Sequence, residues 1–166
     1  MKWIKYTILF FTAIALTLLD TSFFPGLLIK NASIISSFQL MIIFAFLADT
    51  KMYLFFTGIV IIFFSIFSSL PVWVIFVLFF VLPGVIIYLR KGHLPLPSVF
   101  IALILFTIIN FIFEIVLLLY FQEWSKSGFV SLYYFVIINT FFGVVLYYFF
   151  HLFLNLTTRG GKIKNI

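Results

Sequence analysis

The chain has 166 residues, of which 66% are hydrophobic and only 8% are charged. A soluble domain is about 45–50% apolar and about 25% charged, so this composition excludes a water-soluble globular protein. It also excludes a disordered chain, because disordered segments are poor in apolar residues. The sequence has no cysteine, which excludes disulfide bonds and thiolate metal sites. The composition therefore predicts an all-α integral membrane protein that crosses the bilayer several times.

In chain order, the sequence divides into six apolar segments separated by short stretches that contain charged and turn-forming residues. A helix needs roughly 20 mainly apolar residues to cross about 30 Å of hydrocarbon. We expect a single domain over residues 1–156, formed by a compact bundle of six transmembrane helices, followed by a short basic tail over residues 157–166. The six spans are expected near residues 4–19, 34–48, 53–67, 72–89, 99–121 and 130–156.

The connections between these segments carry the residues that end helices. Pro25-Gly26 follows the first segment, and Asp49-Thr50-Lys51 separates the second from the third. The break at residues 68–71 reads Ser-Ser-Leu-Pro and carries no charge, and the second and third spans are short. Five spans with a re-entrant hairpin are therefore an alternative to six.

The distribution of basic residues predicts the orientation. In the six-span topology, eight of the ten basic residues share one side of the membrane, and Lys30 and Lys126 lie on the other. The positive-inside rule then places both termini in the cytoplasm, and the expected location is the cell's plasma (inner) membrane. This topology also accounts for the net charge of +6 without nucleic acid, which is excluded as a partner; the lipid bilayer is the expected surrounding. The eight residues are Lys2, Lys5, Lys51, Arg90, Lys91, Arg159, Lys162 and Lys164.

Four polar residues inside the expected spans are the candidate functional positions. Asn110 and Glu114 are four residues apart in the fifth span and therefore lie on one helical face. The carboxyl group of Glu114 is either a proton or cation site, a contact for a partner, or a neutral group that hydrogen-bonds a neighbouring helix. Gln39 in the second span and Asn139 in the sixth are expected to form hydrogen bonds between helices.

The sequence lacks the catalytic residues and motifs that intramembrane enzymes use. Aspartyl chemistry needs two converging carboxylates, and Asp20 and Asp49 lie at opposite membrane ends in the expected topology. There is no His-Glu-x-x-His motif and no glycine-rich phosphate loop, and His93 and His151 are isolated in the sequence. We therefore expect no enzymatic activity, no catalytic residue, no cofactor and no metal site.

Four short segments resemble the rod shape-determining protein MreD family, whose members are small six-span bacterial proteins with a basic cytoplasmic tail. The resemblance covers nearly the whole chain. It is carried by Thr-Ser-Phe-Phe-Pro at 21–25, Ser-Ser-Leu-Pro at 68–71, Phe-Glu-Ile-Val-Leu-Leu-Leu at 113–119, and Asn139, Gly143 and Leu146-Tyr147 in the last span.

The resemblance implies a non-enzymatic scaffold subunit of the machinery that elongates the bacterial cell wall and regulates cell shape. Its implied partners are an MreC-like bitopic membrane protein, an MreB-like filament at the cytoplasmic face, and the cell-wall (peptidoglycan) synthases. No catalytic residue is implied. Asn110 and Glu114 are the positions expected to make a functional contact between helices.

Substrate-binding subunits of energy-coupling-factor vitamin transporters are a second group of six-span proteins of this size, and we expect a similar fold in them. Their first span usually presents an Ala-x-x-x-Ala face, whereas Ala13 and Ala15 of this chain are two residues apart. A vitamin-binding subunit, or another small transporter that uses Glu114 as a proton site, is the alternative function.

Overall fold

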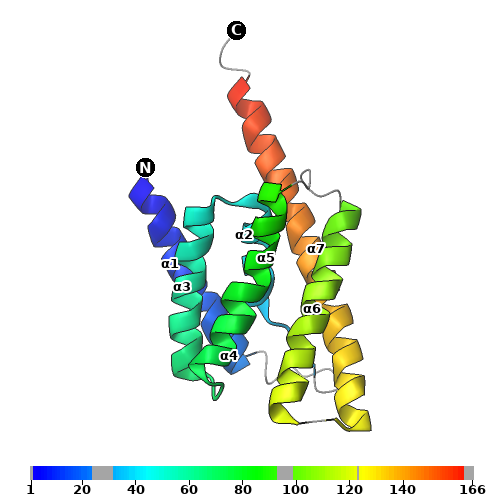
Figure 1. The fold of residues 1–166 in the computed structure, drawn as a ribbon. Helices are drawn as coiled ribbons and strands as arrows, with labels where there is room; N and C mark the ends of the chain where they lie inside the picture. Colours follow the sequence, from blue (N-terminus) through cyan, green and yellow to red (C-terminus); the bar gives the residue numbers. More distant parts are fainter. Residues whose placement is uncertain (1, 24–31, 93–98, 123, 163–166) are drawn as a thin grey trace.

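The computed structural model describes residues 2–23, 32–92, 99–122 and 124–162, which form an all-helical bundle without a β-strand in those ranges (Figure 1). The all-α prediction is therefore confirmed for this part of the chain. The helices are α1 (Lys2–Leu18), η1 (Leu19–Phe23), α2 (Ser36–Leu47), α3 (Thr50–Phe67), α4 (Val72–Phe76), η3 (Val77–Val81), α5 (Leu82–Gly92), α6 (Val99–Phe121) and α7 (Lys126–Lys162). The short elements η1 and η3 are π-helical.

These elements join into six helical stretches, which occupy the six expected ranges. Four stretches are long and apolar enough to cross a membrane: Thr50–Phe67, Val72–Arg90, Phe100–Phe121 and Lys126–Leu152. The other two, Tyr6–Ser22 and Ser36–Leu47, are apolar but shorter. Within the described residues, the length and composition of four helices are thus compatible with a membrane protein.

Successive stretches run in alternating directions, so the start of α1 and the end of α7 lie at the same end of the bundle (Figure 1). That end is called the terminal end below, and the other is called the far end. The first residues of α1, the start of α3 and the end of α5 bring basic positions to the terminal end. Lys126, at the start of α7, lies at the far end.

The first and last stretches differ most from their expected ranges. The first stretch begins at Lys2 and continues as a π-helix to Phe23, and α7 begins at Lys126 and continues to Lys162. Most of the tail expected over residues 157–166 is thus helical. Hydropathy marks where apolar residues stop, but a helix continues until a residue or a connection breaks it. Only glycines 160 and 161, near the end of α7, interrupt its sequence in this region.

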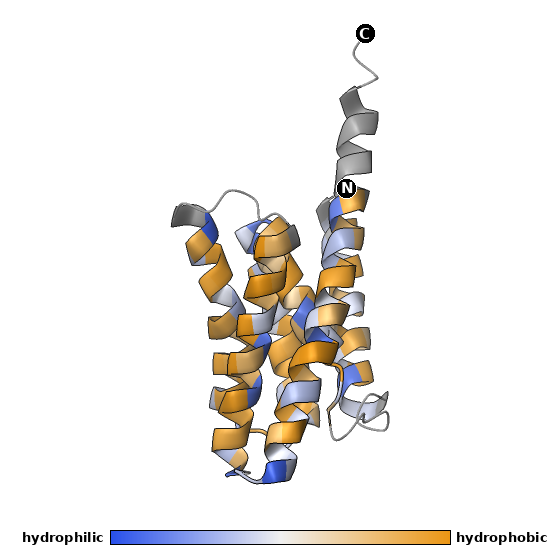
Figure 2. Ribbon diagram, turned by 90° about the vertical axis from the view of Figure 1, so that its right-hand side faces the viewer, coloured by the Kyte–Doolittle hydropathy of each residue, from blue (hydrophilic) through white to orange (hydrophobic). Residues whose placement is uncertain are grey.

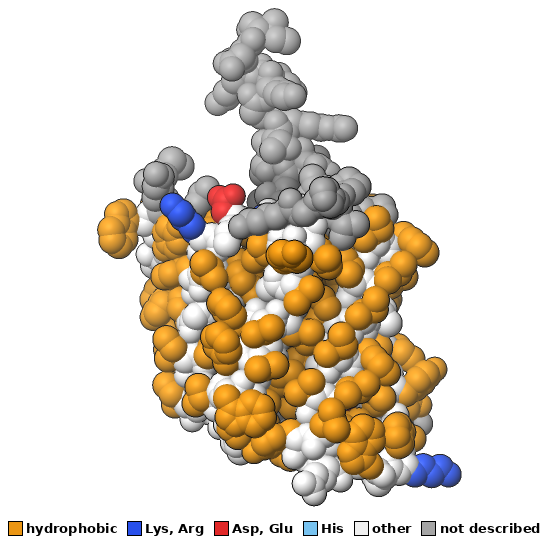
Figure 3. All heavy atoms as spheres, viewed as in Figure 1, with side chains coloured by type: hydrophobic (Ala, Val, Ile, Leu, Met, Phe, Trp, Pro, Cys, Tyr) orange, Lys and Arg blue, Asp and Glu red, His pale blue; other side chains and the backbone are white. Residues whose placement is uncertain are grey.

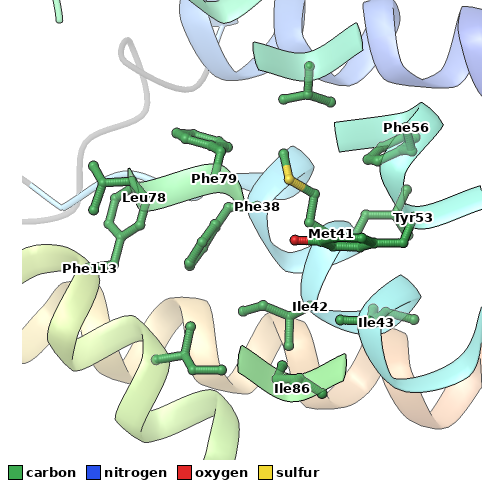
Figure 4. Packing of buried hydrophobic residues seen from close by; sticks show 14 of the residues in the cluster. Phe38, Met41, Ile42, Ile43, Tyr53, Phe56, Leu78, Phe79, Ile86 and Phe113 are labelled. Atoms are coloured by element: carbon green, nitrogen blue, oxygen red, sulfur yellow. The ribbon is translucent and has the colours of Figure 1, made fainter. Parts of the chain in front are cut away.

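The central element is α2, whose side chains are buried on all sides. Ten of its residues are buried, including Phe38, Met41 and Ile42, which are fully enclosed. Figure 4 shows these side chains among those of α3, η3 and α6, where Phe79 and Phe113 pack against Phe38 at ring-centroid distances of 5.7 and 4.3 Å. A helix that is apolar all round belongs in the interior of a bundle.

The fourth stretch is widened into a π-helical turn just before Pro83. Proline has no backbone N–H to continue the helical ladder, so the turn that precedes it is a natural place for an irregularity. The hydroxyl of Tyr53 on α3 donates a hydrogen bond to the carbonyl of Phe80 within this turn, at 2.9 Å. The irregular turn is thereby tied to the neighbouring helix.

The outside of the bundle is apolar along most of its length. Hydrophobic residues make up most of each helix, and hydrophilic ones occur at the two ends and at a few positions between them (Figure 2). The space-filling view shows the same distribution on one face, with charged side chains only near the ends (Figure 3). Large side chains such as Phe141 (71% exposed) and Phe100 (68%) are exposed in midhelix or near helix starts. Such a surface fits hydrocarbon rather than water.

The close approach of α7 to α2 and α6 depends on Gly143. A Cβ atom at this position would lie 2.5 Å from the ring of Phe106 and 2.6 Å from Oε1 of Gln39. We predict that Gly143→Ala lowers the stability of the detergent-solubilised protein by about 1–3 kcal/mol, because the buried neighbours must shift. The measurement is the thermal unfolding midpoint.

Gly58 on α3 is the matched control, because nothing lies within 4 Å of a Cβ built there. Gly58→Ala is expected to be neutral or to stabilise by up to about 1 kcal/mol through helix propensity. Equal midpoints for the two variants would contradict the close packing at Gly143.

Candidate functional site

The N-terminus of α2 is capped by Asp20, which comes from η1 at the end of the first stretch. Its Oδ1 accepts hydrogen bonds from the backbone N–H and the hydroxyl of Ser36, at 2.8 and 2.6 Å. Its Oδ2 accepts from the backbone N–H of Ser37 at 2.8 Å and from the Ser37 hydroxyl. The first N–H groups of a helix have no partner within it, and a negative charge complements the helix dipole there. Asp20 therefore satisfies four donors at one buried helix end.

Asn139 of α7 holds the same end of α2. Its Oδ1 accepts from the backbone N–H of Ile35 at 3.0 Å, and its Nδ2 donates to the carbonyl of Ser33 at 2.9 Å. The same Nδ2 also donates to the carbonyl of Phe135 at 3.1 Å, one turn earlier in α7. Asn139 thus pairs backbone groups of the segment leading into α2, which fixes this segment against α7.

Gln39 links α2 to two other helices. Its Nε2 donates to Oδ1 of Asn110 on α6 at 2.8 Å and to Oδ1 of Asn139 at 3.4 Å. Asn110 in turn donates from Nδ2 to the hydroxyl of Thr140 on α7, at 3.3 Å. All four side chains are buried, so each bond is made in an apolar interior where an unpaired polar group is costly.

The C-terminus of α2 is capped by Arg90 of α5. Its Nη1 donates to the carbonyl oxygens of Phe46 and Ala48, at 2.9 and 3.0 Å. The last carbonyls of a helix lack internal partners, and a positive charge complements that end of the dipole. The two ends of α2 therefore meet side chains of opposite charge, each supplied by a different helix.

The structure brings three of the four candidate residues together in one cluster and places the fourth, Glu114, against Ser131 of α7. Gln39, Asn110 and Asn139 form one hydrogen-bonded cluster on three helices. Glu114, one turn from Asn110, accepts a hydrogen bond on Oε1 from the hydroxyl of Ser131 on α7, at 3.4 Å. Helical periodicity predicts a shared face, but it does not specify which neighbours each position meets.

Asp20 and Arg90 are the polar contacts that sequence reasoning missed. Asp20 was expected only at a membrane end, and Arg90 only as one of the basic residues of a connection. A sequence signal for Asp20 does exist, because Ser36 and Ser37 precede the apolar run of α2 and serine is typical of a helix start. The carboxylate that binds them is 16 and 17 residues away in the sequence, and no short sequence motif predicts a contact at that separation.

Glu114 lies in a hollow of about 300 Å³ between α6, α7 and the segment leading into α2. Ser33, Ser127 and Ser131 are the other polar side chains among its lining residues, and Leu117 and Phe135 are among the apolar ones. Glu114 itself is 8% exposed. The recess is thus lined by both polar and apolar residues.

A second, wider hollow lies on the outside of α1 and α3. It has a volume of about 620 Å³ and is almost entirely apolar, with Trp3, Tyr6, Phe10 and Phe55 among its lining residues. Tyr6 and Phe55 meet edge to face across the two helices, with ring centroids 5.0 Å apart. This apolar groove faces outward near the terminal end of the bundle.

Metal-binding groups do not gather in the part of the chain that the structure describes: no three His, Cys, Asp or Glu side chains lie close enough to share an ion there. His151 stacks on Tyr147 with a centroid distance of 5.9 Å, and His93 lies outside the described residues.

Comparison with known proteins found no family model, no curated protein and no solved structure that matches this chain. The proposed function therefore depends on the sequence and on the geometry of the bundle.

The cap at Asp20 makes a direct prediction. Asp20→Ala leaves buried N–H and hydroxyl donors of Ser36 and Ser37 without an acceptor, and we expect a loss of about 2–4 kcal/mol. The measurement is the thermal or denaturant midpoint of the purified protein in detergent.

Asp49 provides the control, because it is also an aspartate at a helix start. It directly precedes α3, but it is exposed and its side chain does not cap that helix. Asp49→Ala should change stability by less than about 0.5 kcal/mol. If the two substitutions cost the same, the cap at Asp20 is not what holds α2 in place.

Proposed function

We propose that this chain is a non-enzymatic scaffold subunit of a bacterial membrane complex, of the kind that elongates the cell wall and regulates cell shape. The observation that carries the proposal is the use made of the polar side chains inside the bundle. Asp20, Gln39, Asn110, Asn139 and Arg90 are all bonded to helix ends or to each other. The polar groups of these side chains serve to hold the helices in place.

A protein built in this way acts through its outer surface. Exposed Phe, Ile, Leu and Val side chains cover the helices, and the apolar groove on α1 and α3 is wide enough to take large side chains of a neighbouring helix. Helices in a membrane associate through close packing rather than through hydrophobic driving force, and a preformed groove favours such packing. The proposed occupant is the single transmembrane helix of a bitopic partner.

The resemblance to the MreD family supports this assignment and names the partners. They are an MreC-like bitopic protein for the groove, an MreB-like filament at the cytoplasmic face, and the cell-wall synthases. The family motifs at residues 21–25 and 113–119 include or adjoin Asp20 and Glu114, which the structure places at the cap and in the Glu114 hollow.

The proposed location is the plasma membrane, with the terminal end of the bundle in the cytoplasm. Lys51 and Arg90 lie at the terminal end, together with the first residues of α1 and the last of α7. Lys126 stands at the far end. This asymmetry follows the positive-inside rule.

A substrate-binding subunit of a vitamin transporter is the second candidate, and one observation favours it. The Glu114 hollow has a volume of about 300 Å³ and polar walls, and it lies where α6 and α7 meet at the far end. In the proposed orientation this is the outer face, where such a subunit receives its ligand. Binding of a small molecule and scaffolding use different parts of the molecule.

The orientation predicts the behaviour of reporter fusions. Alkaline phosphatase fused to the C-terminus should be inactive and green fluorescent protein should fluoresce there, because this end remains in the cytoplasm. Alkaline phosphatase inserted after Ser125, between α6 and α7, should be active. An active C-terminal phosphatase would contradict the six-span orientation.

The scaffold function predicts selective copurification. In mild detergent, the tagged chain should retain the MreC-like protein of the same organism, and depletion of the chain should turn rod-shaped cells round. The double substitution Tyr6→Ala and Phe55→Ala should reduce the retained partner several-fold, because it removes the aromatic wall of the apolar groove.

Phe141→Ala serves as the control, since it removes an aromatic ring that is 71% exposed on α7, away from the groove. It should leave the retained partner unchanged. Copurification with a transporter ATPase instead, together with normal cell shape after depletion, would favour the transporter subunit and overturn the scaffold.

A further inference from the structure

The Glu114 hollow is a polar site that the scaffold function leaves unused. Glu114, Ser33, Ser127 and Ser131 are among the residues that line it. Glu114 is 8% exposed and accepts a hydrogen bond from Ser131 at 3.4 Å. Keeping a carboxyl group in an apolar bundle is costly, and such groups usually mark a function.

The recess leads from the far end of the bundle into its interior. Ser127 is exposed near the start of α7, and Phe121 ends α6 at the same level. Glu114 lies seven residues before the end of α6, which places it about 10 Å deeper at 1.5 Å per residue. The lining of the hollow therefore extends from the level of the far end to the carboxyl group.

We propose that the Glu114 hollow binds a primary ammonium group carried on a short chain. An ammonium group has three donors and no acceptor, and the residues that line this hollow include one with a carboxyl group and three serines. No Lys or Arg side chain is among the described residues that line it, so an anion would meet no cationic partner there. The carboxyl group of Glu114 therefore favours a cation over an anion.

The size and the apolar part of the wall select an organic cation. A volume of about 300 Å³ is much larger than one water molecule, which occupies about 30 Å³ of the liquid, so a bare metal ion would leave most of it empty. Leu117, Leu118 and Phe135 line the remainder and pack against a short carbon chain. Two sources supply this chemistry: a free amine, or the headgroup of phosphatidylethanolamine. The proposal does not depend on the scaffold function.

The test is a titration of the full-length protein in detergent with ethanolamine hydrochloride, read as the thermal unfolding midpoint and as heat of binding. A saturable rise of the midpoint is expected. Potassium chloride at equal ionic strength and neutral ethylene glycol should not produce it. Absence of an effect specific to the ammonium compound would overturn the proposal.

Variants locate the site. Glu114→Gln should weaken binding at least tenfold, while Asp49→Asn, which removes a carboxylate at the terminal end, should bind as the wild type does. Ser127→Phe narrows the mouth at an exposed position and should also abolish binding, which provides a test if Glu114→Gln fails to fold. Unchanged affinity in Glu114→Gln, or in Ser127→Phe, would contradict the assignment.

Nanodiscs distinguish the two sources. If ethanolammonium binds in phosphatidylcholine discs but is displaced when phosphatidylethanolamine is included, the lipid headgroup is the ligand. Equal binding in both identifies a free amine. Loss of binding in both kinds of disc would contradict an ammonium site.

Discussion

The ends of α2 impose the constraint on which the rest of the bundle depends. This helix has 12 residues, which span about 18 Å at 1.5 Å per residue, well short of the roughly 30 Å of a bilayer core. Its side chains are buried on all sides, and Ser36 and Ser37 at its start are 4% and 0% exposed. The unpaired N–H and C=O groups at its ends must therefore find partners inside the protein.

Three other stretches provide those partners. Asp20 comes from η1, Asn139 from α7 and Arg90 from α5, and Gln39 in the middle of α2 ties it to Asn110 of α6. Each bond both satisfies a backbone or side-chain group of α2 and fixes the position of another helix. The same scarcity of polar residues that identifies a membrane protein explains why so few polar side chains remain for chemistry. This is the physical basis for assigning the function to the outer surface and to the Glu114 hollow.

Hydropathy and turn residues were sufficient to predict the helices. The range of α6, residues 99–121, agrees at both ends, and the six stretches fall where apolar segments were expected. Hydropathy did not show that α2 is central, because a segment facing lipid and a segment buried in protein are equally apolar. The end of α7 was also missed, since the helix continues past the last apolar residues.

The candidate site was predicted by residue type but not by partner. Gln39, Asn110 and Asn139 stand out because a polar side chain in an apolar span needs a hydrogen bond, and the structure places them together. The roles of Asp20 and Arg90 depend on contacts across 16 and across 42 to 44 residues, which arise only when the helices pack. The position of Glu114 in a separate hollow likewise depends on which part of α7 lies opposite it.

A double-mutant cycle between Asp20 and its serines tests the capping of α2 most directly. It compares the free energies of unfolding of Asp20→Ala, of Ser36→Ala with Ser37→Ala, and of the triple variant. The capping model predicts a coupling energy of at least about 1 kcal/mol, because the hydroxyl donors left unpaired by Asp20→Ala are absent from the triple variant. Strictly additive effects would show that Asp20 does not bind these serines, and would contradict the central role of the capped helix.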